Sequence, residues 1–97
     1  MMLNERIKQL REDRQIPQRK LAAALDIDTA TYCKIEKDER RVKAEQVVVI
    51  ADLLQIDKDE LLTLWLADQV TDVVEDGHKV AGKALKIAQE NIKKIKI

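Results

Sequence analysis

The scarcity of glycine, proline and aromatic residues most restricts how this chain folds. Its 97 residues include two glycines, one proline, one tryptophan, one tyrosine and no phenylalanine. Sheet proteins need turn formers between their strands and are enriched in aromatic side chains. Alanine, leucine, isoleucine, lysine, glutamate and glutamine dominate here, and these residues suit helices. The composition therefore predicts an all-α protein.

Apolar residues at helical spacing predict six helical segments. We expect them from a cap at Asn4 to near Arg14, at about 18–25, 29–37 and 44–54, from 58 towards Val74, and at about 79–94. Pro17 disfavours a helical residue before it and so ends the first segment. The side chains of Asp28 and Asp57 can accept hydrogen bonds from the helices that follow, and Glu60 three residues after Asp57 resembles a capping box.

Composition and charge exclude several classes of protein. The chain has 18 Lys/Arg and 18 Asp/Glu, whereas a DNA-binding domain is usually basic, although phosphates respond to one local face. Cys33 is the only cysteine, so no intramolecular disulfide forms. Neither a signal peptide nor an apolar run near the roughly 18 residues of a membrane span is present, so we expect a cytoplasmic protein. Because no zinc spacing, phosphate-binding loop or catalytic triad pattern occurs, we expect no enzyme activity, catalytic residue, metal or cofactor.

Residues 18–37 form the most informative segment. Two short helices are expected here, separated by a break of three or four residues around Asp26 and Ile27. Such helices can cross steeply, and the second then presents its N-terminal end outward, where it can reach base edges in a DNA major groove. The spacing therefore predicts a helix-turn-helix.

Two stretches carry a family resemblance: QRKLAAALDIDTATYCKIEKDERR at 18–41 and VVVIADLLQIDKDELL at 47–62. Together they resemble the lambda-repressor-like, or Xre-type, helix-turn-helix family over about residues 3–65. The matching positions are Gln18, Leu21, Ala22, Ile27, Lys34, Ile35, Glu36, Ile50, Ala51, Leu54, Glu60, Leu61 and Leu62. The resemblance implies an all-α, five-helix lambda-repressor-like DNA-binding domain at residues 1–66, with a C-terminal helical extension at 67–97.

The resemblance also implies roles for individual residues. Base-reading side chains are expected at Thr29, Ala30 and Lys34, and contacts to the DNA backbone at Gln18, Arg19, Thr31, Cys33, Lys37, Arg40, Arg41 and Lys43. Gln18 is expected either to hold a phosphate or to help position the third helix. Arg11 and Glu36 match a partly buried structural ion pair. The sequence departs from the family pattern where Asp26 and Asp38 replace turn glycines.

An apolar face on the fifth helix predicts a homodimer. It consists of Leu62, Trp65, Leu66, Val70 and Val73, and it is larger than a small monomer needs. The resemblance thus implies sequence-specific binding of double-stranded DNA, at a palindromic operator, by a transcriptional regulator of the restriction–modification controller or phage-repressor kind. Two alternatives are an antitoxin that binds a toxin through residues 78–97, and a protein-interaction module that has lost DNA binding. The last helix could pack on the dimer, swap between subunits, or bind another protein.

Overall fold

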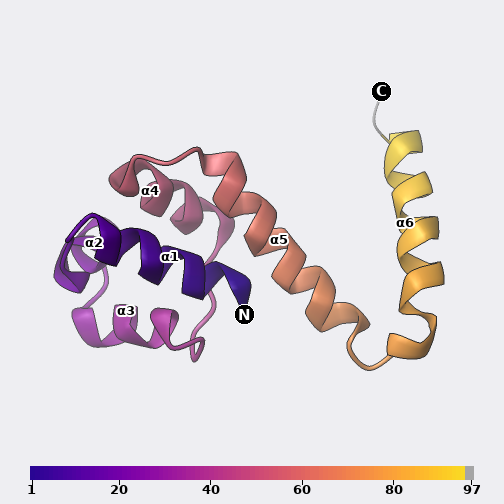
Figure 1. The fold of residues 1–97 in the computed structure, drawn as a ribbon, viewed down its shortest axis with the longest axis horizontal. Helices are drawn as coiled ribbons and strands as arrows, with labels where there is room; N and C mark the ends of the chain where they lie inside the picture. The colour runs from indigo at the N-terminus through magenta and orange to yellow at the C-terminus, as the bar shows by residue number, and fades with distance from the viewer. Residues whose placement is uncertain (96–97) are drawn as a thin grey trace.

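A computed structural model of the chain describes residues 1–95, and the last two residues of the predicted extension lie outside this part. Its elements are α1 (Met2–Asp13), α2 (Gln18–Ala24), α3 (Thr29–Glu36), α4 (Ala44–Leu54), α5 (Lys58–Val74), the 3₁₀ turn η1 (His78–Val80) and α6 (Ala81–Ile95). No strand occurs in the described residues, so the all-α prediction is confirmed. The first four helices and the start of α5 pack into one bundle, in which α5 lies beside α4 and α1, and α6 stands apart at the far end of α5 (Figure 1).

The apolar residues that repeat at helical spacing in α1 to α5 form one core. Twelve apolar side chains are at most 5% exposed: Leu3, Ile7, Leu10, Leu21, Ala22, Tyr32, Ile35, Val47, Ile50, Ala51, Leu54 and Leu61. Each helix contributes one stripe of its surface, as expected for amphipathic helices that pack together. This core fixes α3 by one face and leaves its other face to solvent.

An aspartate from α5 holds the first turn of α1. The carboxylate of Asp68 accepts hydrogen bonds from the backbone N–H groups of Met2 and Leu3, at 3.1 and 3.0 Å. Asp68 is 7% exposed, and its charge also suits the positive end of the α1 dipole. The prediction that Asn4 caps this helix is wrong, because Asn4 lies inside α1 and donates its side-chain N–H to the Glu36 carbonyl. A residue 65 positions away replaces the local cap.

Asp68→Ala is expected to lower the free energy of unfolding by about 1–2 kcal/mol, because it leaves two N–H groups of α1 without acceptors. Asp72→Ala is the matched control on the same helix, since within residues 1–95 Asp72 pairs only with the exposed side chain of Arg41. Its loss should cost less than about 1 kcal/mol. Urea denaturation of both variants measures the difference, and equal costs would show that the Asp68 contacts do not hold α1.

The two predicted aspartate caps are confirmed. Asp28 accepts from the Thr31 N–H at 2.6 Å, and Asp57 accepts from the Asp59 N–H at 3.2 Å. The capping box expected between Asp57 and Glu60 does not form, because the Glu60 carboxylate lies 3.4 Å from the Arg6 guanidinium instead. A long side chain at the start of α5 therefore contacts α1 rather than its own helix.

Two turns use aspartate where a left-handed backbone is required. Asp26, between α2 and α3, has φ 57°, and Asp38, after α3, has φ 61°. Glycine adopts this conformation freely, while aspartate tolerates it better than most residues because its short side chain can hydrogen-bond locally. The replacements noted in the sequence therefore keep the expected turns.

The fifth helix is continuous through the boundary predicted between residues 66 and 67. It extends past the core, and after Glu75–Gly77 the chain turns through η1 into α6. No helix within residues 1–95 is both long and apolar enough to cross a membrane.

Candidate nucleic-acid interface

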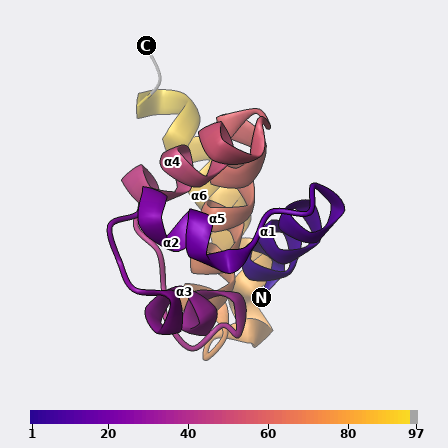
Figure 2. The same ribbon diagram turned by 90° about the vertical axis from the view of Figure 1, so that its left-hand side faces the viewer.

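Helices α2 and α3 form a tight helix-turn-helix (Figure 2). The Ile27 N–H donates to the Ala22 carbonyl at 3.0 Å, which closes the turn between them. The Ile27 side chain is half-buried and packs against the core, while Leu21 and Ala22 are buried beneath it. This anchoring sets the direction in which α3 presents its outer surface.

Helix α3 has two clearly different faces. Tyr32, Ile35 and Glu36 are buried, whereas Ala30 and Lys34 are exposed and Cys33 is half-exposed. Lys37, which follows the last residue of α3, is also exposed. Thr29 is exposed at the first position of the helix, and Thr31 is half-buried at its edge. The structure therefore brings the three predicted base-reading residues, Thr29, Ala30 and Lys34, to the solvent-facing side of one short helix.

A buried carboxylate anchors the inner face of α3. The Glu36 side chain is 3% exposed, and its two oxygens accept from the Arg11 Nε at 2.6 Å and Nη2 at 3.0 Å. Arg11 also donates to the Ile16 carbonyl at 3.0 Å, and the Gln18 side-chain N–H donates to Glu36 at 3.1 Å. The ion pair implied by the resemblance is present, and it joins α1, α2 and α3.

The ionisation of this cluster follows from its contacts. Burial alone would raise the pKa of the Glu36 carboxyl, but the hydrogen bonds from Arg11 and Gln18, with the nearby Tyr32 hydroxyl, outweigh burial and hold its pKa below the ordinary value of 4.5. Hydrogen bonding to Glu36 raises the pKa of Arg11. Burial, and then the neighbouring Glu36 carboxylate, raise the pKa of Tyr32, whose hydroxyl has no partner of standard hydrogen-bond geometry in the described residues. Glu36 and Arg11 are thus both charged at neutral pH.

Gln18 contacts α3 through this cluster. Its side-chain N–H donates to the Glu36 carboxylate at 3.1 Å, a contact that suits the role of positioning α3. The neighbouring Arg19 is exposed. The residues predicted to contact the DNA backbone fall into two groups. Five have exposed side chains, namely Arg19, Lys37, Arg40, Arg41 and Lys43, and three are half-buried, namely Gln18, Thr31 and Cys33.

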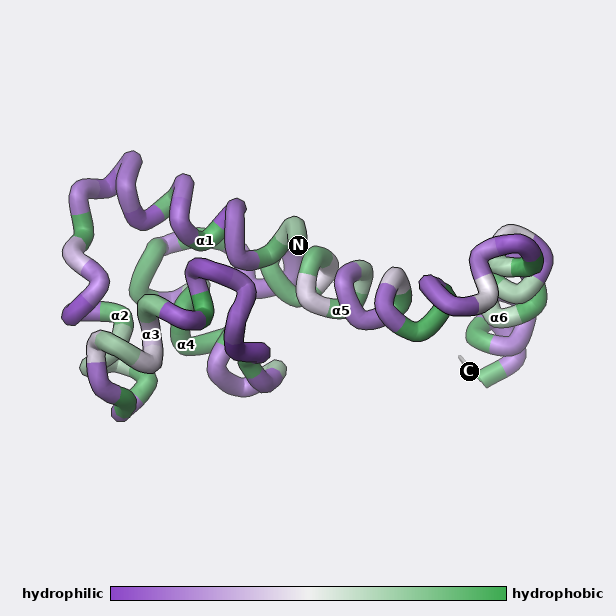
Figure 3. Tube along the Cα trace, turned by 90° about the horizontal axis from the view of Figure 1, so that it is seen from below, coloured by the Kyte–Doolittle hydropathy of each residue, from purple (hydrophilic) through white to green (hydrophobic). Residues whose placement is uncertain are grey.

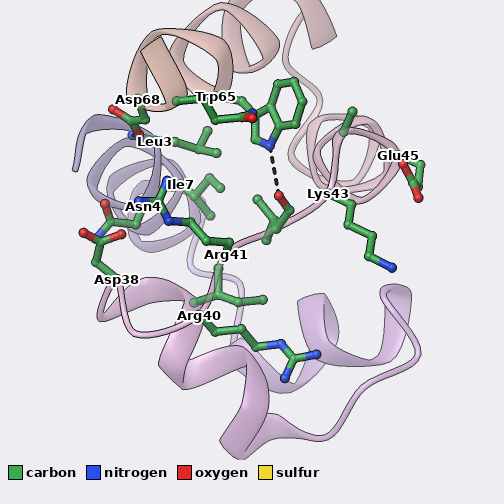
Figure 4. Close-up of a pocket in the computed structure, with 14 residues that line it drawn as sticks. Leu3, Asn4, Ile7, Asp38, Arg40, Arg41, Lys43, Glu45, Trp65 and Asp68 are labelled. Carbon is green, nitrogen blue, oxygen red and sulfur yellow. Dashed lines mark hydrogen bonds between the residues drawn. The ribbon is translucent and has the colours of Figure 1, made fainter. Parts of the chain in front are cut away.

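The loop after α3 contains three exposed cations with different surroundings. Arg40 and Lys43 point away from the α1–α5 side of the loop, whereas Arg41 turns towards α1 (Figure 4). Arg41 forms an ion pair with Asp72 of α5. Its charge is therefore partly neutralised within the chain, unlike the charges of Arg40 and Lys43, for which no ion pair is found in residues 1–95.

The helix-turn-helix segment is locally basic although the chain is neutral. Residues 18–43 hold seven Lys/Arg and five Asp/Glu, and one of the five, Glu36, is buried against Arg11. Asp26, Asp28, Asp38 and Glu39 are exposed. The exposed side chains of α2, α3 and the following loop therefore carry a small excess of positive charge. Phosphates respond to such a local charge.

The predicted dimer residues do not form one uniform surface. Trp65 is half-buried against the core, and its indole N–H donates to the Val42 carbonyl at 2.9 Å (Figure 4). Leu62 also packs partly on the core. Leu66, Val70 and Val73 are 55%, 37% and 81% exposed, so the accessible part of this face lies beyond the core, on the second half of α5.

Comparison with known proteins identifies the family of this fold. The Helix-turn-helix family model, which describes the Xre or lambda-repressor-like group, matches residues 7–61. This match covers more than half of the chain, and the chain belongs to that family. No curated protein and no solved structure matched the sequence. The protein is a DNA-binding regulator of the helix-turn-helix class.

Three contacts that the structure shows were not predicted from the sequence. Each contact joins residues more than twenty positions apart: Asp68 with the start of α1, Asp72 with Arg41, and the Val42 carbonyl with the Trp65 indole. An aspartate within an apolar helical pattern was the one visible signal, because a buried carboxylate requires a partner. Nothing local in the sequence identifies which partner that is.

Proposed function

We propose that this protein is a sequence-specific transcriptional regulator that binds double-stranded DNA as a homodimer, with α3 in the major groove. The observation that carries the proposal is the division of α3 into a face locked by Glu36 and an opposite, exposed face. A recognition helix must be rigid on one side and free on the other, because base contacts demand a fixed position.

The exposed face of α3 suits base readout. Lys34 offers only hydrogen-bond donors, so the O6 and N7 acceptors of guanine are its natural partners. The Thr29 hydroxyl can contact several bases, and Ala30 offers a methyl group for contact with thymine. These assignments rest on exposure and on position along α3.

Contacts to phosphates would fix the position of α3 in the groove. Arg19, Lys37, Arg40 and Lys43 are exposed on or next to the helix-turn-helix, and Thr31 and Cys33 lie at the edge of α3. The loop after α3 is a suitable backbone contact, since its cations follow the recognition helix directly. Arg41 is a weaker candidate because of its pairing with Asp72.

A twofold dimer is supported by the apolar surface on the second half of α5. Leu66, Val70 and Val73 are exposed there without cover from the rest of the chain in the described residues. A dimer would place two copies of α3 about one turn of DNA apart, which matches a palindromic operator. We rank a restriction–modification controller or phage-type repressor first.

An antitoxin is the second candidate. The observation that favours it is the exposed apolar side of α6, on which a toxin could dock. Co-purification from cells that express the neighbouring gene would separate the two candidates, because a controller or repressor should purify without a toxin.

Arg40→Ala is expected to weaken binding to DNA of any sequence and to reduce the slope of log affinity against log salt by about one unit. Arg41→Ala is the matched control: it removes the same charge type one residue away, but from a side chain already paired with Asp72. Its slope should change less. Fluorescence anisotropy with a duplex of arbitrary sequence, across a salt series, gives both slopes. Unchanged slopes in both variants would remove this loop from the interface.

A further inference from the structure

The loop after α3 contains two adjacent arginines with different surroundings. Residues 37–41 read KDERR, and this hydrophilic run follows α3 in Figure 3. Arg40 has no ion pair within residues 1–95, whereas Arg41 pairs with Asp72 on the second half of α5. The Arg41 side chain turns towards α1, and the Arg40 side chain points away from it (Figure 4). Helix α5 therefore holds one arginine of the two and leaves the other free.

The carboxylate of Asp72 has no structural task in the described residues besides this pair. Asp68, one turn earlier on α5, is 7% exposed and accepts hydrogen bonds from two backbone N–H groups of α1. The Asp72 side chain is 35% exposed, and within residues 1–95 its carboxylate contacts only the Arg41 guanidinium. The two aspartates of α5 thus differ: one holds α1, and the other holds a cation of the loop that follows the recognition helix.

The ion pair between Arg41 and Asp72 is exposed enough to open. The two side chains are 59% and 35% exposed, and ion pairs in such positions stabilise a folded chain only weakly. A phosphate oxygen accepts hydrogen bonds from a guanidinium in the same way as a carboxylate oxygen does. A DNA phosphate beside this loop and the Asp72 carboxylate would therefore compete for the same side chain.

We propose that Asp72 competes with the DNA backbone for Arg41 and thereby lowers the affinity of the protein for DNA of every sequence. The inference rests on the DNA binding of the proposed function, and it adds a residue of α5, outside the helix-turn-helix, to the groups that determine this affinity. A contact between Arg41 and a phosphate requires the ion pair to open, so the loss of the pair offsets part of the gain. Because phosphate contacts carry no sequence information, the preference for one DNA site over another is unaffected.

A double-mutant cycle tests the competition. Wild type, Asp72→Asn, Arg41→Ala and the double variant are titrated with a duplex of arbitrary sequence across a salt series. Asp72→Asn should raise the affinity about two- to fivefold and steepen the slope of log affinity against log salt by up to about one unit. Arg41→Ala should change this slope little in the wild-type chain and reduce it by about one unit in the Asp72→Asn chain. Equal effects of Arg41→Ala in the two backgrounds would overturn the inference, as would a loss of affinity in Asp72→Asn.

Glu75→Gln is the matched control for net charge. Glu75 is exposed, lies three residues after Asp72 at the end of α5, and has no ion pair within residues 1–95. Its substitution removes the same charge without releasing an arginine, so its gain in affinity should be smaller than that of Asp72→Asn. Equal gains in the two variants would show an effect of net charge alone and overturn the competition.

The same titrations separate this inference from the proposed function. If neither wild type nor Asp72→Asn binds the duplex, the DNA binding of the proposed function fails, and the competition fails with it. If wild type binds and the cycle shows no coupling between Arg41 and Asp72, only the competition fails. An indirect effect of Asp72→Asn on assembly would appear equally in the presence and absence of Arg41, so it would also be seen as no coupling.

Discussion

Glu36→Ala is expected to lower the free energy of unfolding by about 3–5 kcal/mol. The substitution leaves the Arg11 guanidinium, which is 13% exposed, without its carboxylate partner. It also removes the acceptor for Gln18 and the anion beside Tyr32. Since these residues come from α1, α2 and α3, the loss should loosen the junction that positions the recognition helix. Urea denaturation followed by circular dichroism measures the effect.

Glu36→Gln separates the charge from the shape of this side chain. It keeps an acceptor oxygen for Arg11 but removes the negative charge, so its cost should be smaller than that of alanine. Glu12→Gln is the control, because Glu12 is an exposed carboxylate near the same arginine. Its Oε2 lies 3.9 Å from the Arg11 Nη2, and its side chain is 57% exposed. It should change stability by less than about 1 kcal/mol. Equal effects at Glu36 and Glu12 would contradict the anchoring role.

The contribution of Glu36 should also depend on pH. Its pKa is lower in the folded chain than the ordinary value of 4.5, so the folded state favours the carboxylate. The stabilisation from ionisation is therefore fully present well above pH 4.5 and is lost as the pH falls through the folded-state pKa. The stability difference between wild type and Glu36→Gln should shrink in acid. A difference that stays constant from pH 7 to pH 3 would show that the charge contributes nothing.

Lys34→Ala is expected to weaken binding to the preferred DNA site by about 1–3 kcal/mol and to relax selection at one base pair per half-site. Lys34 is exposed on the outer side of α3, and its donors can read guanine. Lys37→Ala is the matched control, since it removes the same side chain from the end of the helix. Its effect should be similar for all sequences, because a phosphate contact carries no sequence information.

The comparison uses each protein with a preferred duplex and with a mismatched duplex in the same salt. Lys34→Ala should narrow the affinity ratio between the two duplexes, whereas Lys37→Ala should leave it unchanged. If both variants leave the ratio unchanged, Lys34 does not read a base.

The helices of this fold could be predicted from the sequence because their determinants are local. Leu21, Ala22 and Ile27 mark one face of α2 and the turn after it, and Asp28 has the short acceptor that begins α3. The spacing of Val47, Ile50 and Leu54 likewise defines α4. Residues within one or two turns of each other determine such features, so periodicity is sufficient to find them.

Contacts between distant segments could not be predicted in the same way. Asn4 has the chemistry of a helix cap, but Asp68 performs that function from α5. Trp65 has the apolar area of an interface residue, yet its indole N–H is bound to Val42. Arg41 and Arg40 are equivalent in sequence and differ only because Asp72 lies beside one of them. Each outcome depends on how α5 packs, which no local pattern specifies.

The neutral charge of the chain illustrates the same distinction for function. Exposed acids at Asp26 and Asp38 occupy turn positions, while Glu36 is internal and compensated by Arg11. Seven of the exposed cations of the described residues lie on α2, on α3 and in the following loop. A count over the whole chain averages these features and conceals a local surface suited to phosphates.

Selection of binding sites from random double-stranded DNA by the full chain tests directly whether α3 reads a DNA sequence. A homodimer with α3 in the major groove should enrich a palindromic motif whose half-sites are separated by one helical turn, about 10 base pairs. Selection with Lys34→Ala should give the same spacing with reduced preference at one position in each half-site. If the wild-type protein enriches no motif, the exposed face of α3 does not read DNA, and a protein-interaction module without DNA binding becomes the better explanation.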